Sequence, residues 1–328
     1  MRYRLLVFTL LLFSCSTSKE SEPDTYQPPV NDPRYEHFDP LPAGNSGIAS
    51  RYPGDAGIGA DENVIFADDF ESYGGAVDLA GKWNEAYHAG NLRIASEPGN
   101  FFDGEKGLEF KVPQTSNEVS NEVVKHISPE QDSLFLRYYG KYDSTFNVEG
   151  SSHNGCTMSS SYWSGPGSGP GIRADGFNKY FVSYEAGRFE TGIANPGQLN
   201  IYIYYPAQRD IWGDHFYPTG RIIPFDQKPG DFGPQFVARP DIVPELGRWY
   251  CYELMVKANT PGKRNGRIAT WLDGKLIADF QNLELRATNS LKIDRISIDL
   301  HVKNNTLAEA RKWIDNVVVA KSYIGPMY

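Results

Sequence analysis

Hydrophobic and polar residues alternate clearly in the stretch that begins at Leu134, which predicts a strand over 134–143. One face of that strand carries Leu134, Leu136, Tyr138 and Tyr142, and the other carries Phe135, Arg137, Tyr139 and Lys141. Because side chains of a strand point alternately to opposite faces, the second face is cationic and aromatic and suits the wall of a groove. A Gly/Ser-rich loop with His153 and Asn154 follows, so we expect an imidazole near this wall.

The same reasoning predicts many short strands along the chain, separated by turn signals such as Asp273-Gly274. The other predicted strands are 64–71, 91–95, 107–112, 122–127, 179–185, 199–205, 248–257, 266–272, 275–280, 292–302 and 313–320. Short strands of this kind indicate an all-β fold, a β-sandwich or jelly roll. Two long irregular stretches, 155–178 and 206–247, are predicted to be binding loops, although decorative surface loops are the alternative.

Three further strands have one apolar face and one polar face. Their polar faces carry Asn200, Tyr202 and Tyr204 on the first, Asp299, His301 and Lys303 on the second, and Cys251, Glu253 and Lys257 on the third. In a sandwich the apolar faces meet in the core. If the polar faces lie together on one concave sheet, they form a groove suited to a sugar chain.

Composition agrees with many strands, because the 328 residues include 20 Tyr, 18 Phe, 32 Gly and 22 Pro. The formal net charge is −9 and the pI about 5.2, with no basic patch, so we do not expect nucleic acid as a partner. An acidic protein binds an anionic polymer only through a local cationic cleft. We expect a monomer.

The N-terminal segment is predicted to be a targeting signal rather than part of the fold. Arg2 and Arg4 precede an apolar run, and Leu12-Phe13-Ser14-Cys15 resembles a lipobox. Residues 1–14 are therefore predicted to be a lipoprotein signal peptide, with Cys15 lipidated at the bacterial cell envelope and the membrane contacted only through that lipid. An ordinary signal peptide with an incidental Cys is the alternative.

Residues 15–61 are rich in Pro, Ser, Gly and acidic residues and are predicted to be a disordered tether, partly wrapped on the domain near Tyr35 to Phe38. The folded domain is predicted over 62–328. Two further cysteines, Cys156 and Cys251, could pair in an oxidising compartment, which their spacing does not decide.

Several motifs then resemble one known group of proteins. They are Asp68-Asp69-Phe70-Glu71, the strand 136–143 with His153-Asn154-Gly155, Trp271-Leu272-Asp273-Gly274, and Trp313-Ile314-Asp315-Asn316-Val317-Val318-Val319-Ala320. Together they resemble the concanavalin A-like jelly-roll domains of polysaccharide lyases, above all the alginate and glucuronan lyases of families 14 and 20. The resemblance covers roughly residue 63 to the C-terminus and implies long loops over a concave sheet that holds a glycan.

The resemblance implies cleavage of an anionic, uronic-acid-containing polysaccharide such as alginate or glucuronan by β-elimination. This reaction needs a group that neutralises the uronate carboxylate, a base and an acid. By residue type the neutralising groups are Arg137 and Asn154, the base is His153, and the acid is Tyr202 or Tyr204. Residues expected to bind neighbouring sugars are Lys141, Tyr139, Arg173, Glu253, His301 and Lys303. The catalytic motifs of well-studied alginate lyases are not present verbatim.

Two other functions stay open. A glycoside hydrolase on this fold would need paired carboxylates, and no E-x-D-x-E pattern occurs in the sequence. A non-catalytic surface glycan-binding lipoprotein would keep the groove but lack a base and an acid in register.

The sequence shows no H-x-x-x-H or C-x-x-C pattern of metal ligands, and we expect no required cofactor. Related sandwiches can carry a structural Ca²⁺ held by oxygen ligands, for which Asp68 and Asp315 are the candidates.

Overall fold

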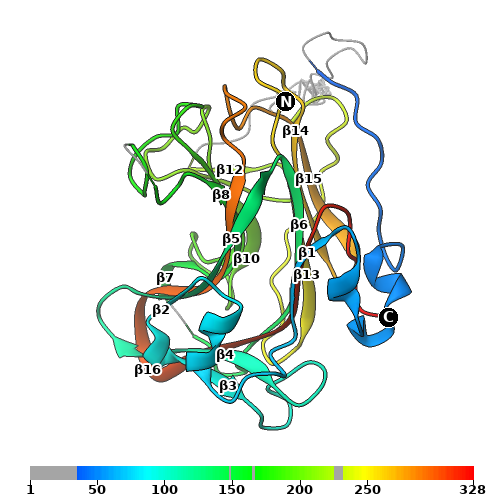
Figure 1. The fold of residues 1–328 in the computed structure, drawn as a ribbon. Helices are drawn as coiled ribbons and strands as arrows, with labels where there is room; N and C mark the ends of the chain where they lie inside the picture. The colour runs from blue at the N-terminus through cyan, green and yellow to red at the C-terminus, as the bar shows by residue number, and fades with distance from the viewer. Residues whose placement is uncertain (1–34, 148, 165–166, 225–231) are drawn as a thin grey trace, which may run out of the picture.

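A single strand, β16 (Ile293–Ala320), runs through both layers of the molecule. The computed structural model describes residues 35–147, 149–164, 167–224 and 232–328. The sequence predicted two separate strands here. Residues 293–302 of β16 belong to one curled antiparallel sheet, and residues 305–320 belong to the other (Figure 1). The predicted all-β sandwich of the jelly-roll type is confirmed.

The first sheet, which we call sheet A, has the strand order β15-β14-β13-β6-β16-β4-β3, with β1 beside the end of β16. Its strands are β1 (Val64–Asp68), β3 (Leu92–Ala95), β4 (Gly107–Thr115), β6 (Ser133–Tyr142), β13 (Tyr250–Lys257), β14 (Gly266–Leu272) and β15 (Lys275–Leu283).

The second sheet, sheet B, has the order β12-β11-β10-β9-β8-β16-β5-β2, and β7 continues the line of β8 along β16. Its strands are β2 (Glu85–Tyr87), β5 (Val119–Gln131), β7 (Glu149–His153), β8 (Gly155–Ser160), β9 (Tyr180–Gly187), β10 (Gln198–Tyr204), β11 (Asp214–Phe216) and β12 (Ile222–Ile223).

Among the described residues helical structure is confined to short 3₁₀ turns, and none of these is long and apolar enough to cross a membrane. The turns are η1 (Ile48–Arg51), η2 (Pro53–Asp55), η3 (Ile58–Ala60), η4 (Ala76–Gly81) and η5 (Ala89–Asn91).

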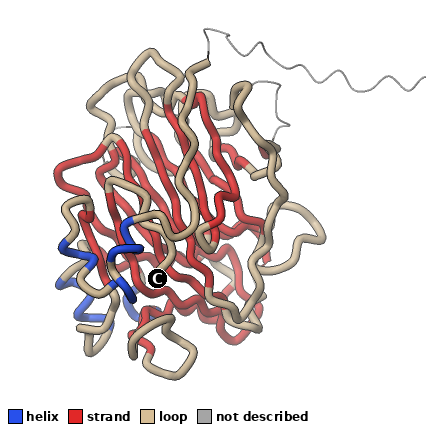
Figure 2. Tube along the Cα trace, turned by 90° about the vertical axis from the view of Figure 1, so that its right-hand side faces the viewer, coloured by secondary structure: helices blue, strands red, loops and turns tan. Residues whose placement is uncertain are grey.

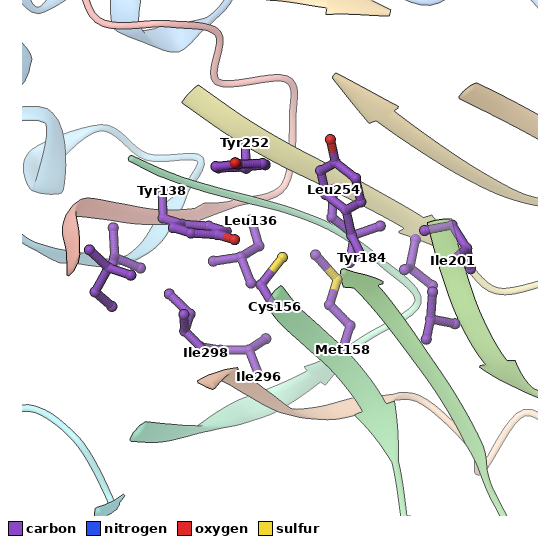
Figure 3. Packing of buried hydrophobic residues seen from close by; sticks show 14 of the residues in the cluster. Leu136, Tyr138, Cys156, Met158, Tyr184, Ile201, Tyr252, Leu254, Ile296 and Ile298 are labelled. Carbon is purple, nitrogen blue, oxygen red and sulfur yellow. The ribbon is translucent and has the colours of Figure 1, made fainter. Parts of the chain in front are cut away.

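The core lies between the two sheets, where their apolar faces meet (Figure 3). Cys156 and Met158 of β8 point toward Leu136 of β6 and Leu254 of β13, and all four side chains are fully buried. Burying a side chain of this size stabilises the fold by roughly 1.5–3 kcal/mol. The alternation in the sequence therefore identified the core face of each strand correctly.

The outer face of sheet A is covered by other parts of the chain. Ile48 and Ile58 from the N-terminal segment and Ile324 from the C-terminal end pack on Met255 and Trp271 of the sheet. Figure 2 looks onto this side of the molecule, and the C-terminal end lies in front of the strands. The part of the predicted tether that the structure describes, residues 35–61, is thus packed against the domain.

Four residues that the sequence assigned to a sugar-binding groove lie on this covered face. Arg137 is completely buried and forms an ion pair with Asp55 of η2. Glu253 is also buried and accepts hydrogen bonds from the backbone N–H groups of Ile324 (2.8 Å) and Gly325 (2.9 Å). The expectation that these two residues line a groove is wrong, because both hold other segments of the chain against sheet A.

Tyr139 and Lys141 follow the same pattern. The Tyr139 hydroxyl accepts a hydrogen bond from the backbone N–H of Met327 at 2.7 Å. Lys141 donates to the carbonyl of Gly99, and its ammonium lies 4.6 Å from the centre of the Trp313 ring. Their predicted contact with a sugar is wrong for the same reason, since the strand that carries them belongs to sheet A.

The two cysteines in the described residues are free and buried, so the pairing considered above does not form. Cys156 belongs to the core between the sheets, and Cys251 lies on the outer face of sheet A with Arg137 and Tyr139.

The buried ion pair between Arg137 and Asp55 yields a test of its structural role. Arg137→Met leaves the largely buried Asp55 carboxylate without its partner, so the free energy of unfolding should fall by about 3 kcal/mol. The matched control is Arg248→Met, which breaks the half-exposed pair with Asp273 (3.1 Å) and should cost less than about 1 kcal/mol. Urea unfolding measures both, and equal losses would contradict the structural role of Arg137.

Candidate functional site

A cleft of about 680 Å³ lies on the outer face of sheet B. Its floor is formed by side chains from six strands, which are Glu122, His153, Thr157, Tyr202, His215 and Asp299. Its walls include the aromatic residues Tyr162, Trp163, Phe181, Phe189 and Trp212. A concave site with mostly apolar walls and a few converging polar groups is the usual form of a ligand site.

His153, at the end of β7, is held by a buried carboxylate. Its Nδ1 lies 2.9 Å from Oε2 of Glu185, whose side chain is fully buried on β9. Burial lowers the pKa of His153, but the charge and hydrogen bond of Glu185 outweigh it, so the pKa is raised above 6.5. The pair resembles a base and its orienting carboxylate, because Glu185 fixes the tautomer of the imidazole through Nδ1.

Three aromatic rings stack in a row across the floor. The Tyr202 ring lies 4.6 Å from His153 on one side and 4.7 Å from His215 on the other, and both stacks are nearly parallel. Nδ1 of His215 lies 3.0 Å from the Asn200 side-chain oxygen, so it donates there in the neutral ring. Burial, followed by the nearby His153, lowers the pKa of His215 well below 6.5, which keeps this imidazole neutral.

Two carboxyl groups face each other across neighbouring strands of the floor. Asp299 of β16 is directly opposite Glu122 of β5 in the register, so their β-carbons lie about 5 Å apart. Burial raises the pKa of both carboxyl groups. For Asp299 the effect of burial outweighs the positive charge of the buried Lys312 ammonium, which lowers the pKa. The Lys312 ammonium donates to the Asp299 backbone carbonyl at 2.9 Å. Carboxyl groups with raised pKa values are a source of protons near neutral pH.

Gly155 separates Asp299 from Glu185 in the floor. Its N–H donates to Oδ1 of Asp299 at 3.1 Å, and it is the register partner of Glu185 on β9. A β-carbon at this position would lie 1.8 Å from the Tyr184 carbonyl oxygen. Only glycine fits here, because the backbone of β9 lies directly against this position.

One end of the cleft carries His301 and Lys303 from β16 together with Glu118. Nε2 of His301 lies 3.0 Å from Oε1 of Glu118, whose side chain is largely exposed. Burial and the nearby His153 lower the pKa of His301 to about 4. Lys303 is exposed and is the only Lys or Arg side chain among the described residues that line this cleft.

Two long loops form the wall at the other end and are fastened to each other. The Arg173 guanidinium donates to the carbonyls of Gln208 (2.8 Å) and Arg209 (2.6 Å). The Tyr202 hydroxyl donates to the carbonyl of Trp212. Arg173 does not line the cleft. Instead of contacting sugar, as predicted, it links the two loops through these hydrogen bonds.

The structure brings together four of the residues predicted from sequence, His153, Tyr202, His301 and Lys303. Tyr204 lies beneath them, fully buried, with its hydroxyl 3.0 Å from that of Tyr202. Asn154 is also buried, and its backbone carbonyl accepts a hydrogen bond from the Tyr142 hydroxyl at 2.6 Å. The expectation that these two line the cleft is therefore wrong.

Sequence reasoning missed several residues of the site. They are Glu122, Glu185, His215, Trp163 and Trp212. A signal existed for Glu185, because Ser183 and Glu185 alternate with the core residues Val182, Tyr184 and Ala186. The two Trp residues lie in the long stretches that were predicted to be binding loops, but no pattern in the sequence singled them out within those loops.

The residues considered for Ca²⁺ are satisfied by protein donors. Asp68 accepts hydrogen bonds from Tyr73 (2.6 Å), Lys82 (2.9 Å) and Trp83 (2.7 Å). Asp315 accepts from the backbone of Phe102 and Asp103, and burial raises its pKa to about 7. Within the described part of the chain no group of three or more His, Cys, Asp or Glu residues is arranged to hold a metal ion.

Known structures share this fold. No protein-family model and no curated protein matches the sequence. Alginate lyase Aly36B, solved as a variant with an alginate trisaccharide, superposes with a TM-score of 0.57 at 13% identity over 80% of this chain and 100% of its own. The PL-14 alginate lyase of Aplysia kurodai gives a TM-score of 0.52 at 13% identity over 79% and 99% of the two chains. The endo-β-1,4-glucuronan lyase of the fungus Trichoderma reesei gives 0.50 at 15% identity over 79% and 96%.

The contact between Glu185 and His153 gives a direct test of the site's electrostatics. Glu185→Gln removes the charge that raises the pKa of His153 and leaves its burial unchanged, so that pKa should fall below 6.5. Titration of the imidazole by NMR measures the change. Glu190→Gln, which alters a carboxylate paired with Arg221, should leave the pKa of His153 where it is. An unchanged His153 titration in Glu185→Gln would contradict the pairing.

Proposed function

We propose that this protein is a polysaccharide lyase that cleaves an anionic, uronic-acid-containing polysaccharide by β-elimination. The observation that carries the proposal is the His153–Glu185 pair on the floor of an open cleft, in a fold shared with alginate and glucuronan lyases. A non-catalytic glycan-binding protein has no need of a buried carboxylate that orients an imidazole.

His153 is proposed as the general base. Its Nε2 takes the proton from C5 of the uronate, the electron pair forms the C4–C5 double bond, and the C4–O bond breaks. Glu185 stabilises the imidazolium that results and holds the productive tautomer through Nδ1. A positioned base of this kind contributes roughly 10²–10⁴-fold to the rate.

Lys303 is proposed to meet the uronate carboxylate, because it is the cationic side chain that lines the cleft beside His301. The departing glycosidic oxygen needs a proton, and the Asp299 carboxyl is proposed to donate it. Burial raises the pKa of Asp299, so its protonated form persists closer to neutral pH than that of an ordinary aspartate.

Tyr202 is proposed as a positioning residue. Its hydroxyl already donates to the Trp212 carbonyl, and its ring is packed between His153 and His215. Tyr202 as the acid, the role expected from sequence, would require that hydrogen bond to break.

Hydrolysis is the second candidate, and one observation favours it. Glu122 and Asp299 are directly opposite on neighbouring strands of the floor, which is the kind of carboxyl pair that glycosidases use. Alternation along single strands does not reveal this pair, because its members are far apart along the chain. The products distinguish the two reactions, since only elimination leaves an unsaturated sugar.

We further propose that the protein is a bacterial envelope lipoprotein attached through Cys15. This proposal is supported by the apolar run and Leu12-Phe13-Ser14-Cys15 alone, since Cys15 lies outside the described residues.

The lyase proposal predicts ultraviolet absorbance from unsaturated ends when the protein is incubated with a panel of uronate polysaccharides. His153→Ala should lower kcat by about 10²–10⁴-fold, and Tyr202→Phe, which keeps the ring, should lower it far less. His126→Ala is the control, because His126 lies on β5 outside the cleft. Reducing sugar without absorbance would establish hydrolysis instead, and a Tyr202→Phe loss equal to that of His153→Ala would make Tyr202 the acid.

The proposed acid and base also predict a pH profile. The rate should rise with pH as His153, whose pKa is raised, loses its proton. It should fall again as Asp299 loses the proton that it must donate. Asp299→Asn should abolish the alkaline limb along with most of the activity, and an unchanged profile in this variant would rule Asp299 out as the acid.

The lipoprotein proposal predicts that Cys15→Ser moves the protein from the membrane fraction to the soluble fraction of a bacterial host. Metabolic labelling with a fatty acid should mark the natural sequence and not the variant. Cys251→Ser is the control, because Cys251 is buried in the fold. Labelling that persists in Cys15→Ser would contradict lipidation at this residue.

A further inference from the structure

The two ends of the cleft differ in chemistry. Along β16 the residues Asp299, His301 and Lys303 lead to one end, and Arg295 lies at the other beside the Trp163 wall. Arg295 and Lys303 are separated by roughly 26 Å of strand at about 3.3 Å per residue. The cleft therefore has room for several sugars, each of which meets different side chains.

The charged end offers a single site for a carboxylate. Lys303 is the one Lys or Arg side chain among the described lining residues, whereas Glu118, Glu122 and Asp299 are carboxyl groups. Arg295, behind the wall, is already paired with Glu85 (3.1 Å) and Glu122 (3.3 Å). A polymer with a carboxylate on every sugar would bring a further negative charge next to the exposed Glu118 carboxylate, which is unfavourable.

The aromatic end suits uncharged sugars. Trp163 and Trp212 project from the two loops with 54% and 59% of their surface exposed, although both line the cleft. Exposed Trp residues on a solvent-filled wall indicate a surface that a ligand covers. Trp212 is held by its carbonyl bond to Tyr202 and by close contact of its ring with Gly171, so this wall is formed in advance.

The floor between the two ends contains a buried hydroxyl group that lacks a hydrogen-bond partner in the described part of the chain. Oγ1 of Thr157 is buried and has no hydrogen-bond partner among the described residues, and Thr157 lines the cleft. A buried polar group without a partner is costly. A sugar hydroxyl satisfies a threonine hydroxyl as donor or acceptor, and the position of Thr157 in the floor makes a ligand the natural partner.

We infer that the substrate is a heteropolysaccharide in which uronic acids are separated by neutral sugars. One uronate lies at Lys303 and His153, and a neutral sugar lies on the Trp163 and Trp212 wall. This inference rests on the proposed lyase function for the same cleft and narrows its substrate class. Homopolymers of uronic acid are then poor substrates, because the aromatic end would have to accept a second carboxylate.

The test compares three polymers at equal sugar concentration: one that alternates uronate with neutral sugar, a uronate homopolymer and a neutral glucan. Unsaturated ends are measured by ultraviolet absorbance, and binding is measured separately by affinity electrophoresis with the His153→Ala variant. We expect kcat/KM for the alternating polymer to exceed that for the homopolymer by at least about tenfold, which equals about 1.4 kcal/mol. Equal or faster cleavage of the homopolymer would overturn the inference and leave the lyase function intact.

Two pairs of variants test which end of the cleft causes the preference for the alternating polymer. Trp212→Ala should reduce binding of the alternating polymer, whereas Phe177→Ala, an exposed residue of the neighbouring loop outside the cleft, should not. Glu118→Gln should improve cleavage of the homopolymer, and Glu130→Gln, on the same strand outside the cleft, should have no effect. Binding unchanged by Trp212→Ala would overturn the assignment of the aromatic end.

Absence of product from all three polymers would defeat the lyase proposal without deciding the substrate class. The binding measurement then decides it. Stronger retention by the alternating polymer than by the homopolymer supports the inference, and equal or weaker retention overturns it.

Discussion

The molecule depends on one strand that pairs in both sheets. β16 hydrogen-bonds to β5, β7 and β8 in sheet B and to β1, β4 and β6 in sheet A. Residues on its first half alternate between the core, as Ile298 does, and the cleft, as Asp299 does. The position of the catalytic candidates is therefore fixed by the packing of the core, because a shift of one residue along this strand would exchange the two sets.

The cleft combines groups that would be unstable alone. Glu185 is fully buried, and a buried carboxylate is tolerated when it is paired and hydrogen-bonded. His153 is the partner of Glu185, and Tyr202 packs against the imidazole. The Trp212 carbonyl in the loop accepts a hydrogen bond from the Tyr202 hydroxyl. The strands and the loops are thus linked through a short chain of contacts, and a change in the loop reaches the imidazole through a single ring.

Alternation along the sequence predicted which side of each strand faces the core, but it could not say to which sheet a strand belongs. Arg137, Lys141 and Glu253 have the same pattern as Tyr202 and His301, yet they lie on the outer face of sheet A, which other segments of the chain cover. Pairing of strands far apart in sequence decides this, as with Glu122 and Asp299. The stretch before Cys156 was predicted to be a loop, because Gly, Ser and Asn are poor strand formers. It became β7 and β8 because neighbouring strands supply its partners.

Gly155 limits how the floor of the cleft can change by amino-acid substitution. Strands β8 and β9 approach each other closely at this point because Gly155 has no side chain, and even a methyl group there would collide with the Tyr184 carbonyl. Successive substitutions at this position therefore cannot reshape the floor in small steps, because any side chain there would push the two strands apart. New specificities on this scaffold must arise at the walls and ends, where Trp163, Trp212 and Lys303 are exposed.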